Sequence, residues 1–328
     1  MPTAPQADGS APHEAATVPM SPAARMATFV AILGPLVGLV VAVAHSWGWG
    51  FAWVDLELLA GMYLLTALGI TVGYYRLFVH RSFETNIVVK FVLAVLGSMA
   101  VQGALLKWVA LHRRHHQHSD MLDDPHTPHH QGQGLLGWIR GYWRAHIGWF
   151  FEPESAELSR YVPDLEKSRV LRVTSALFPL WIVLGLVIPA ALGGLLTGTW
   201  VGVWTGFIWG GLVRIFLVHH VTWSVNSACH LWGRRPYRSG DESRNNAVFG
   251  ILALGEGWHN THHAFPTSAR HGLRWWQIDF SYWVIRTLEA VGLAWNVKLP
   301  SKQAQAERET PTGTEPGGLS PRNRRASF

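Results

Sequence analysis

The sequence predicts an all-α integral membrane protein with four transmembrane helices in two hairpins and a cytoplasmic helical cap that holds a histidine-ligated metal site. Three observations predict this fold. Apolar residues make up 48% of the 328 residues and charged residues only 15%. Apolar stretches long enough to cross a bilayer recur along the chain, and histidines gather with basic residues at one end of them.

The transmembrane helices are predicted from stretches that approach the roughly 20 apolar residues a bilayer requires. There are five: 27–46, 52–73, 86–106, 173–194 and 199–221. The short connections at 47–51 and 195–198 contain no Lys or Arg, whereas arginines flank the opposite ends. The positive-inside rule therefore places the histidine-bearing ends and both termini in the cytoplasm of a multi-pass protein of the cell membrane.

The stretch 86–106 is expected not to span the membrane, although it is apolar. If it crossed the bilayer, His80 and the histidines that begin at His112 would lie on opposite faces and could not share a site. Lys90 and Gln102 within the stretch are compatible with a helix that lies at the interface or packs against the others. Four spans remain.

The two ends of the chain differ in composition from the middle. Residues 1–25 are rich in Ala, Pro, Ser and Thr, and residues 301–328 are rich in Pro, Gly and Ser. Both segments are expected to be disordered. The predicted membrane domain is therefore 26–300.

Two histidine clusters repeat one spacing, and they indicate a metal site. The first is HRRHH, with His112, His115 and His116; the second is HNTHH, with His259, His262 and His263. Offsets of three and four place imidazoles on one helical face. Asn226 and His230 form another i, i+4 pair, and His80 adds one more nitrogen.

The number and type of these ligands narrow the choice of metal. The single cysteine, Cys229, excludes a thiolate-rich site, so nitrogen and oxygen ligands must suffice. Eight histidines exceed one coordination sphere and indicate two ions. Imidazole suits iron, zinc, copper or nickel. Two irons with open positions activate dioxygen, whereas two zinc ions would favour hydrolysis.

At these residues the sequence resembles the membrane fatty acyl desaturases of the stearoyl-CoA desaturase type. Three segments within about 30–295 carry the resemblance: HRRHH followed by Asp124-Pro125-His126, the run TWSVNSACHLWGRRPY from Thr222 to Tyr237, and EGWHNTHH from Glu256 to His263. The resemblance implies a di-iron enzyme of unsaturated fatty acid biosynthesis. Similar proteins use dioxygen and two electrons to insert a cis double bond near carbon 9 of a saturated acyl chain.

The resemblance also implies roles for individual residues, with no catalytic side chain beyond the metal centre. Trp108 and Thr222 match positions that line the bend of the acyl tunnel, and Asn226 would reach an iron through water. Asp124, Glu256 and Asp279 could orient imidazoles by contacting the ring nitrogen that does not bind the metal. The implied iron ligands are His80, His112, His115, His116, His230, His259, His262 and His263.

Two departures from the family pattern stand out. Tyr75 occupies the position of the first histidine in the usual HRxxxH box. It could donate a phenolate to ferric iron, leave room for water, or simply pack while the site has one ligand fewer. Water or another histidine, His118 or His126, is expected to fill the gap. Val109-Ala110-Leu111 replaces the Ala-Arg-Asp of animal acyl-CoA members. The acyl carrier is expected to be coenzyme A, with acyl carrier protein or a membrane lipid left open. Arg113 is the favoured anion contact, beside Arg114 and Lys107.

The remaining partners follow from motifs that the sequence lacks. It has no His-Pro-Gly-Gly haem motif, and its single GxGxxG match, Gly132 to Gly137, follows a segment rich in His and Pro instead of a strand, so it is not a dinucleotide fingerprint. Electrons are therefore expected from a separate donor, a ferredoxin or a cytochrome b5-like protein with its reductase. The net charge of +6 is attributed to contact with membrane lipid and not to nucleic acid.

Three other functions stay open at this point. A di-iron hydroxylase or oxygenase would use the same ligands. A histidine-rich membrane metal transporter or metal-binding protein is the rival from another class, and His219 and His220 inside the last span favour it. An inactive relative is the third, because Tyr75 removes a ligand.

Overall fold

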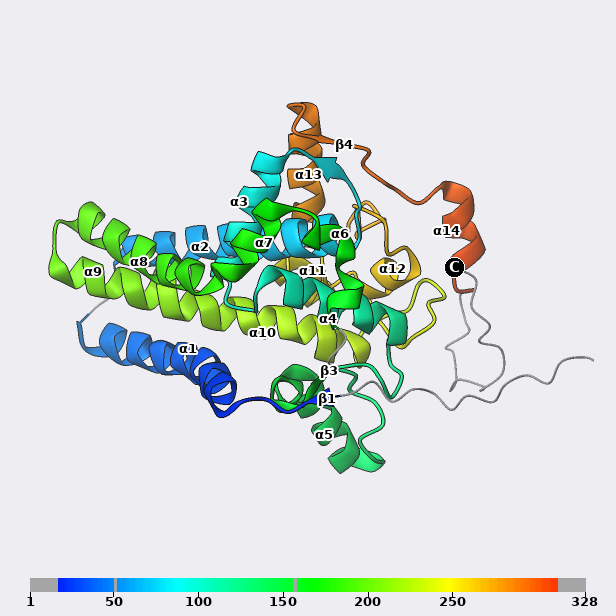
Figure 1. Cartoon of the computed structure of the whole chain (residues 1–328), viewed down its shortest axis with the longest axis horizontal. Helices are drawn as coiled ribbons and strands as arrows, with labels where there is room; N and C mark the ends of the chain where they lie inside the picture. Colours follow the sequence, from blue (N-terminus) through cyan, green and yellow to red (C-terminus); the bar gives the residue numbers. More distant parts are fainter. Residues whose placement is uncertain (1–16, 50–51, 156–157, 312–328) are drawn as a thin grey trace, which may run out of the picture.

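Four long apolar helices run side by side, and a cap of shorter helices covers one end of them (Figure 1). The computed structural model describes residues 17–49, 52–155 and 158–311. The helices with the length and composition to cross a membrane are Pro22–Trp47, Trp53–Val79, Phe178–Thr197 and Trp200–His230. The predicted all-α fold with four spans is therefore confirmed.

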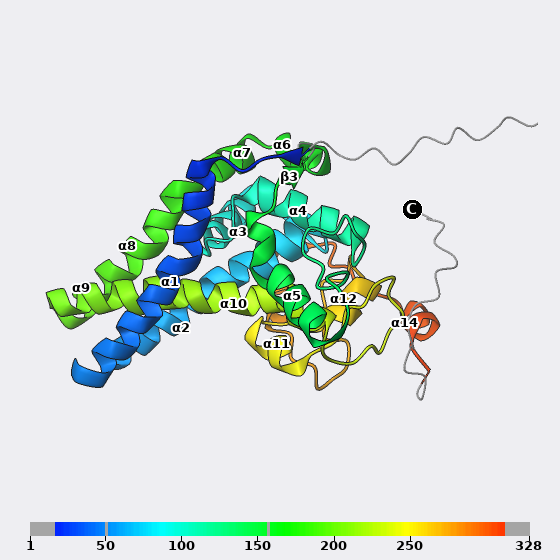
Figure 2. The same ribbon diagram turned by 90° about the horizontal axis from the view of Figure 1, so that it is seen from below.

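The four spans form two hairpins. In the first, α1 (Pro22–Trp49) is followed by α2 (Trp53–Leu68), which continues as the π-helix η1 (Gly69–Val79). The second hairpin contains α8 (Phe178–Thr197), α9 (Trp200–Gly206), the π-helix η4 (Phe207–Val213), α10 (Arg214–Ser227) and η5 (Ala228–His230). Viewed from below, α1 lies across the other spans (Figure 2).

The third span begins later than the predicted 173. A separate amphipathic helix, α7 (Arg169–Ala176), occupies that position, and α8 starts at Phe178. Pro179 lies in the first turn of α8, where its fixed φ favours helix initiation and its missing N–H costs no hydrogen bond.

The stretch 86–106 does not span, as predicted. Its helix α3 (Ile87–Met99) has 13 residues and is ~20 Å long, which is too short for a bilayer core. Val101 and Gly103 then take positive φ angles of 60° and 121°, and the chain turns into α4 (Leu105–His118). The reversal brings the rings of His80 and His112 to a centroid distance of 5.8 Å.

Close helix packing holds α3 against the spans. A Cβ on Gly69 would stand 2.2 Å from the backbone nitrogen of Gly97, so the two helices can approach this closely only because position 69 is a glycine. The fully buried Arg214 donates to the carbonyls of Met99 at 2.5 Å and Gly185 at 2.7 Å. A buried charge is tolerated there because carbonyl oxygens replace its water.

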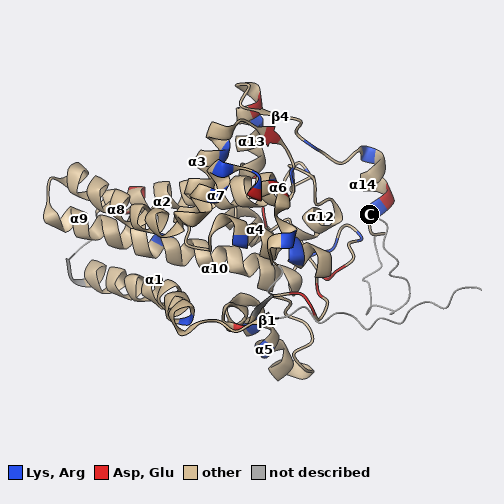
Figure 3. Ribbon diagram, viewed as in Figure 1, with Lys and Arg blue, Asp and Glu red and all other residues tan. Residues whose placement is uncertain are grey.

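The cap consists of short helices joined by loops, with two small antiparallel pairings between distant segments. It carries most of the charged residues, while the far ends of the spans are nearly free of them (Figure 3). The strand pairs are β1 (Thr17–Val18) with β3 (Glu154–Ser155) and β2 (Glu84–Thr85) with β4 (Ala294–Trp295). The other cap helices are α5 (Gly134–His146), η2 (Gly148–Phe151), η3 (Leu158–Tyr161), α6 (Pro163–Glu166), α11 (Ala247–Leu252), α12 (His259–Ala264), α13 (Phe280–Ala290) and α14 (Lys302–Arg308).

The expectation of disorder fails for the inner part of both terminal segments. Helix α1 already begins at Pro22, within the predicted disordered segment 1–25. In 301–328, Ser301 caps α14 by accepting from the amide of Ala304, and the carbonyl of Arg308 accepts from the amide of Arg238 at 2.8 Å. These contacts with the cap order a polar segment that composition alone reads as disordered. Residues 1–16 and 312–328 lie outside the described residues.

Candidate metal centre

The eight predicted histidines converge where the long spans enter the cap. His80 ends η1, and His230 ends the last span. The two HxxHH clusters project three imidazoles each, from α4 and from α12. Six of the eight are buried: His80, His112, His115, His230, His259 and His262.

The first group of imidazoles is formed by His115, His230, His259 and His263. One nitrogen from each lies within 4.8 Å of one from every other. Nε2 of His230 and Nε2 of His259 are 3.0 Å apart. These four residues are called the carboxylate-backed pocket below, for the reason given in a later paragraph.

The second group lies directly beside the first and is formed by His80, His112, His116 and His262. The first three place nitrogens within 4.8 Å of one another. Nε2 of His116 is 3.1 Å from Nε2 of both His112 and His262. These four residues are called the second pocket.

The geometry of both pockets fits a bound metal ion. Imidazole binds a first-row metal such as zinc at about 2.0–2.1 Å, so two nitrogens at right angles on one ion stand ~3 Å apart, as they do here. Nε2 of His80, His115 and His263 is buried without a hydrogen-bond partner among the described residues. Unpaired buried nitrogens are costly unless an ion completes them.

Three imidazoles of the second pocket favour the neutral form. Burial lowers the pKa of His112, His116 and His262 well below the usual value, and the neighbouring histidines lower it further. Neutral imidazole is the form that offers a lone pair to a metal.

Three imidazoles of the carboxylate-backed pocket make direct contact with an aspartate on their outer side. Nδ1 of His115 lies 3.0 Å from Asp124, Nδ1 of His230 2.9 Å from Asp120, and Nδ1 of His263 2.5 Å from Asp241. This arrangement fixes the ring tautomer and makes the inner nitrogen more basic. The sequence flagged Asp124 but missed Asp120 and Asp241, and no local motif marks the latter.

The three aspartates are stabilised as anions. Burial alone raises the pKa of Asp124 and Asp241, but the adjacent His115 and His263 and their hydrogen bonds hold both values below the usual range. Among the residues that the structure describes, the second pocket has no carboxylate in direct contact with its imidazoles.

Tyr75 lies among the imidazoles of the second pocket. Its ring centroid is 4.6 Å from His112, 4.8 Å from His262 and 4.9 Å from His80. Its hydroxyl is buried and has no hydrogen-bond partner in the described part of the chain. The side chain therefore occupies the expected position of the missing ligand.

Neither histidine expected to fill the gap stands beside Tyr75 in the described contacts. His126 packs on His115, with a ring centroid distance of 4.3 Å, and groups with His115 and Asp124. His118 belongs to none of the histidine groups found in the described residues. A different histidine, His271, lies closer, at 5.8 Å from the Tyr75 ring, and the sequence reasoning missed it because no cluster contains it.

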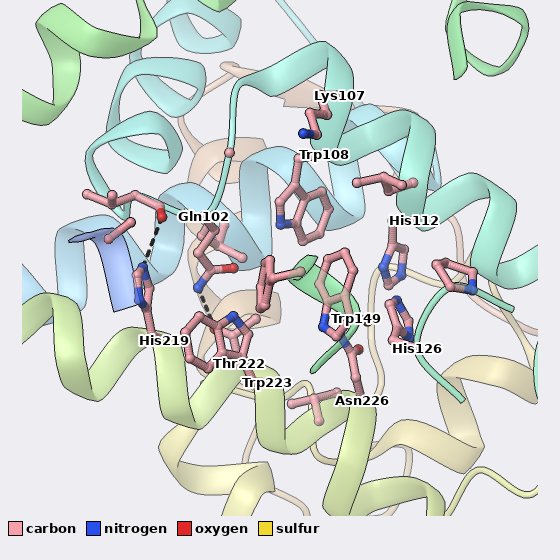
Figure 4. A pocket seen from close by; sticks show the side chains of 18 of the residues that line it. Gln102, Lys107, Trp108, His112, His126, Trp149, His219, Thr222, Trp223 and Asn226 are labelled. Carbon is pink, nitrogen blue, oxygen red and sulfur yellow. Dashed lines mark hydrogen bonds between the residues drawn. The ribbon is translucent and has the colours of Figure 1, made fainter. Parts of the chain in front are cut away.

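An apolar cavity of about 550 Å³ opens beside the pockets (Figure 4). Trp108 lines it and stacks on His112, with ring centroids 5.1 Å apart. Nε2 of Gln102 donates to Oγ1 of Thr222 at 2.9 Å. Asn226 also lines the cavity, so the predicted residues Trp108, Thr222 and Asn226 meet there.

Arg113 does not line the cavity. Its guanidinium makes a two-pronged contact with Asp164, at 2.7 and 3.0 Å, and donates to the carbonyls of Tyr161 and Phe78. The expected contact between Arg113 and an anionic group of the substrate is therefore corrected, because Asp164 and the two carbonyls already accept from the N–H groups of its guanidinium. Lys107 and Arg114 do line the cavity.

The two histidines that favoured a transporter have other contacts. Nε2 of His219 lies 3.0 Å from the carbonyls of Ala100 and Val101, at the turn after α3. Nδ1 of His220 lies 3.0 Å from Nε2 of His146. Neither belongs to the histidine groups of the described residues, which lie at one end of the spans and not along a path through them.

Fold and site together define a class: a four-span membrane protein with a histidine-built candidate metal centre at the end of an apolar cavity. The family model for fatty acid desaturases matches residues 47–297, and the chain belongs to this family. It is therefore an oxidoreductase of lipid metabolism, as the histidine boxes predicted.

Individual relatives differ in the substrates that their names specify. The chain is 43% identical to hex-5-enoyl-(acyl-carrier protein) acetylenase of Moorena producens (strain JHB), over 84% of this chain and 86% of the relative. It is 39% identical to the sn-1 stearoyl-lipid 9-desaturase of Anabaena variabilis, over 83% and 93%. It is 38% identical to the icosanoyl-CoA 5-desaturase of Limnanthes douglasii, over 83% and 72%.

Proposed function

We propose that this protein inserts a cis double bond near carbon 9 of a saturated fatty acyl chain in unsaturated fatty acid biosynthesis. The observation that carries the proposal is the juxtaposition of two histidine pockets with an apolar cavity, in a chain of the desaturase family. The reaction balances when the CH2–CH2 unit and two electrons, with two protons, reduce dioxygen to two water molecules.

The proposed cofactor is a pair of iron ions, one in each pocket. His115, His230, His259 and His263 would hold one ion, with Asn226 reaching it through water. His80, His112, His116 and His262 would hold the other. Iron, when bound, supplies the oxidising power to remove hydrogen from an unactivated CH2 group, which no side chain can supply.

The task of the protein is then to position the chain. The aromatic and apolar wall of the cavity excludes water and holds the acyl chain against the pockets. Trp108 fixes one side of the chain, because its indole is stacked on His112. The Gln102–Thr222 hydrogen bond ties together two further lining residues, and a wall held in this way would select one carbon–carbon bond.

The acyl carrier is the finer part of the proposal. Relatives are named for acyl groups on acyl carrier protein, a lipid and coenzyme A. We favour coenzyme A, and Lys107 and Arg114 at the cavity would then contact its phosphates in place of Arg113.

The proposed setting is the cell membrane, with the cap and both termini in the cytoplasm. A separate one-electron carrier, a ferredoxin or a cytochrome b5-like protein with its reductase, would deliver the two electrons to the cap. The cap carries lysines and arginines as well as acidic residues (Figure 3), and its basic residues would suit an acidic donor.

Fatty acid analysis tests the proposal. The protein is expressed in a desaturase-deficient host with a ferredoxin system, and cellular fatty acids are examined by gas chromatography with mass spectrometry. New cis-9 monoenes, with iron bound to the purified protein, are expected. Assays with stearoyl groups on coenzyme A, acyl carrier protein and glycerolipid then identify the carrier.

Other products would overturn it in distinct ways. Hydroxylated chains would assign an oxygenase, since rebound of oxygen would replace the second hydrogen abstraction. Triple bonds formed from unsaturated chains would assign the acetylenase reaction, which the 43% identical relative makes the second candidate. Unchanged lipids with zinc bound would remove the desaturase proposal.

A further inference from the structure

A chain of buried side chains leads away from the second pocket on its outer side. Nδ1 of His262 lies 3.1 Å from Nε2 of His271, and Nδ1 of His271 lies 3.1 Å from Oε2 of Glu256. The other oxygen of Glu256 accepts from Arg76. His271 and His262 are both completely buried.

The contact between His262 and His271 determines which atoms carry protons when His262 is a metal ligand. A neutral His262 that offers the lone pair of Nε2 to an ion carries its proton on Nδ1, which then donates to Nε2 of His271. The proton of a neutral His271 is then on Nδ1, the nitrogen that faces Glu256. Nε2 of His262 points toward His116 and the second pocket.

The network around Arg76 is built for this arrangement. Arg76 is completely buried and contacts two carboxylates, Glu256 through one nitrogen and Asp279 through the other at 3.0 Å. Asp279 also accepts from the amides of His271 at 2.7 Å and Gly272 at 3.2 Å, which fixes the backbone that carries His271.

The residue before Glu256 is a glycine for a steric reason. Gly255 has a φ of 121°, and a Cβ there would stand 2.3 Å from Oδ1 of Asp279. The missing side chain lets the Arg76–Asp279 ion pair pack against the backbone directly beside Glu256.

His271 itself is not a substitute for the ligand missing at Tyr75. Its Nε2 faces the outer nitrogen of His262, whereas the inner nitrogen of His262 faces His116. An ion bound between His262 and His116 would therefore lie on the opposite side of the His262 ring from His271. The role left to His271 is to orient His262.

We propose that His271, held by Glu256 and Arg76, is a positioning residue that fixes the orientation and tautomer of His262 and thereby retains the metal ion of the second pocket. The proposal rests on the two-ion centre proposed above. It supplies through one intervening imidazole what Asp120, Asp124 and Asp241 supply directly to the other pocket.

Metal content tests this without relying on turnover. His271→Ala removes the relay, whereas His271→Gln preserves an acceptor for His262 and a donor for Glu256. Iron per chain is measured in detergent-purified protein by plasma mass spectrometry, before and after graded chelation, with Mössbauer spectra to count the sites. His271→Ala is expected to lose one of the two ions, with about 10–100-fold weaker binding, and His271→Gln to retain both.

The outcomes separate this proposal from the proposed function. His271→Ala with wild-type metal affinity, or His271→Gln as deficient as His271→Ala, would overturn the positioning role even if the wild type desaturates. Selective loss of one ion supports it even if the wild type makes another product. A wild type that binds no metal overturns both proposals.

A further variant guards against a folding defect. Glu256→Gln keeps the shape of the relay but lets its amide present a donor to His271, and weaker binding in the second pocket is again expected. If the substitutions affect only the positioning of His262, the metal-free variants should unfold at the same temperature as the metal-free wild type. If the variants lose both ions and their metal-free forms also unfold at a lower temperature, the role of His271 is purely structural.

Discussion

The two metal pockets use the same side chain but differ in what stands behind it. Three of the four imidazoles in the carboxylate-backed pocket contact an aspartate within 3.0 Å. Among the described residues, the second pocket has only the indirect contact from His262 through His271 to Glu256, and Tyr75 stands where a fifth ligand is expected. Ligand type alone thus does not determine how strongly an ion is held, because the charged groups that contact the ligands and the number of ligands also contribute.

The largest effect should come from removing an inner ligand. His115→Ala in the carboxylate-backed pocket and His262→Ala in the second are both expected to abolish desaturation, since the reaction requires both ions. Protein levels in the membrane should remain, because the spans are unchanged. Product analysis beside immunoblotting measures this, and full activity in both variants would exclude the two-ion centre.

The histidine boxes could be predicted because their spacing is local, and the structure gathers all of them. The residues behind the imidazoles were predicted only in part: Asp124 contacts His115 as expected, but other contacts were missed. Asp241 and His271 lie in loops of the cap and reach the pockets only through tertiary packing, so no periodicity marks them. Arg113 shows the reverse error: its position inside HRRHH suggested an anion contact, but its neighbours in space, Asp164 and two carbonyls, engage it.

The four spans illustrate the same limit in the fold. Apolar length predicted their number, and the requirement that His80 meet His112 correctly excluded 86–106 as a span. Helix ends were less accurate: composition placed the third span at 173, but Pro179 starts α8 near Phe178. Composition also missed α14, whose order depends on contacts with the cap.

A second prediction concerns the aspartates. Asp241→Asn removes the charge behind His263 while preserving its volume, and it should weaken the ion of the carboxylate-backed pocket by about 10–100-fold. The second pocket should keep its affinity. Graded chelation with metal analysis measures both. Asp123→Asn, an exposed carboxylate beside Asp124, is the control, and equal loss from both pockets would contradict the division.

Tyr75→His should make the metal affinities of the two pockets more alike. An added imidazole beside His80 and His112 would raise the affinity of the second pocket on the order of tenfold, comparable with the lower end of an outer-shell contact. Slower loss of the second ion to a chelator is the measurement. Tyr75→Phe should leave retention unchanged, because only the unpartnered hydroxyl is removed. Loss of an ion from Tyr75→Phe would show instead that the tyrosine oxygen is a ligand.

The smallest expected effect comes from weakening an ion pair that supports both pockets. Asp164 on α6 binds Arg113, which lies between His112 and His115 on α4, so this ion pair anchors the helix that supplies both pockets. Burial alone raises the pKa of Asp164, but Arg113 and Arg81 lower it to about 2. Because its pKa is lower in the folded state, ionised Asp164 stabilises the fold at pH values above the usual carboxyl pKa, and this contribution disappears as the pH falls toward about 2.

Asp164→Asn should therefore lower the free energy of unfolding by about 0.2–1 kcal/mol at neutral pH, as is typical of partly exposed pairs. Thermal unfolding in detergent tests this against Glu166→Gln, an exposed carboxylate on the same helix. A selective loss of one ion in Asp164→Asn would show that α4 is not the shared support of the two pockets.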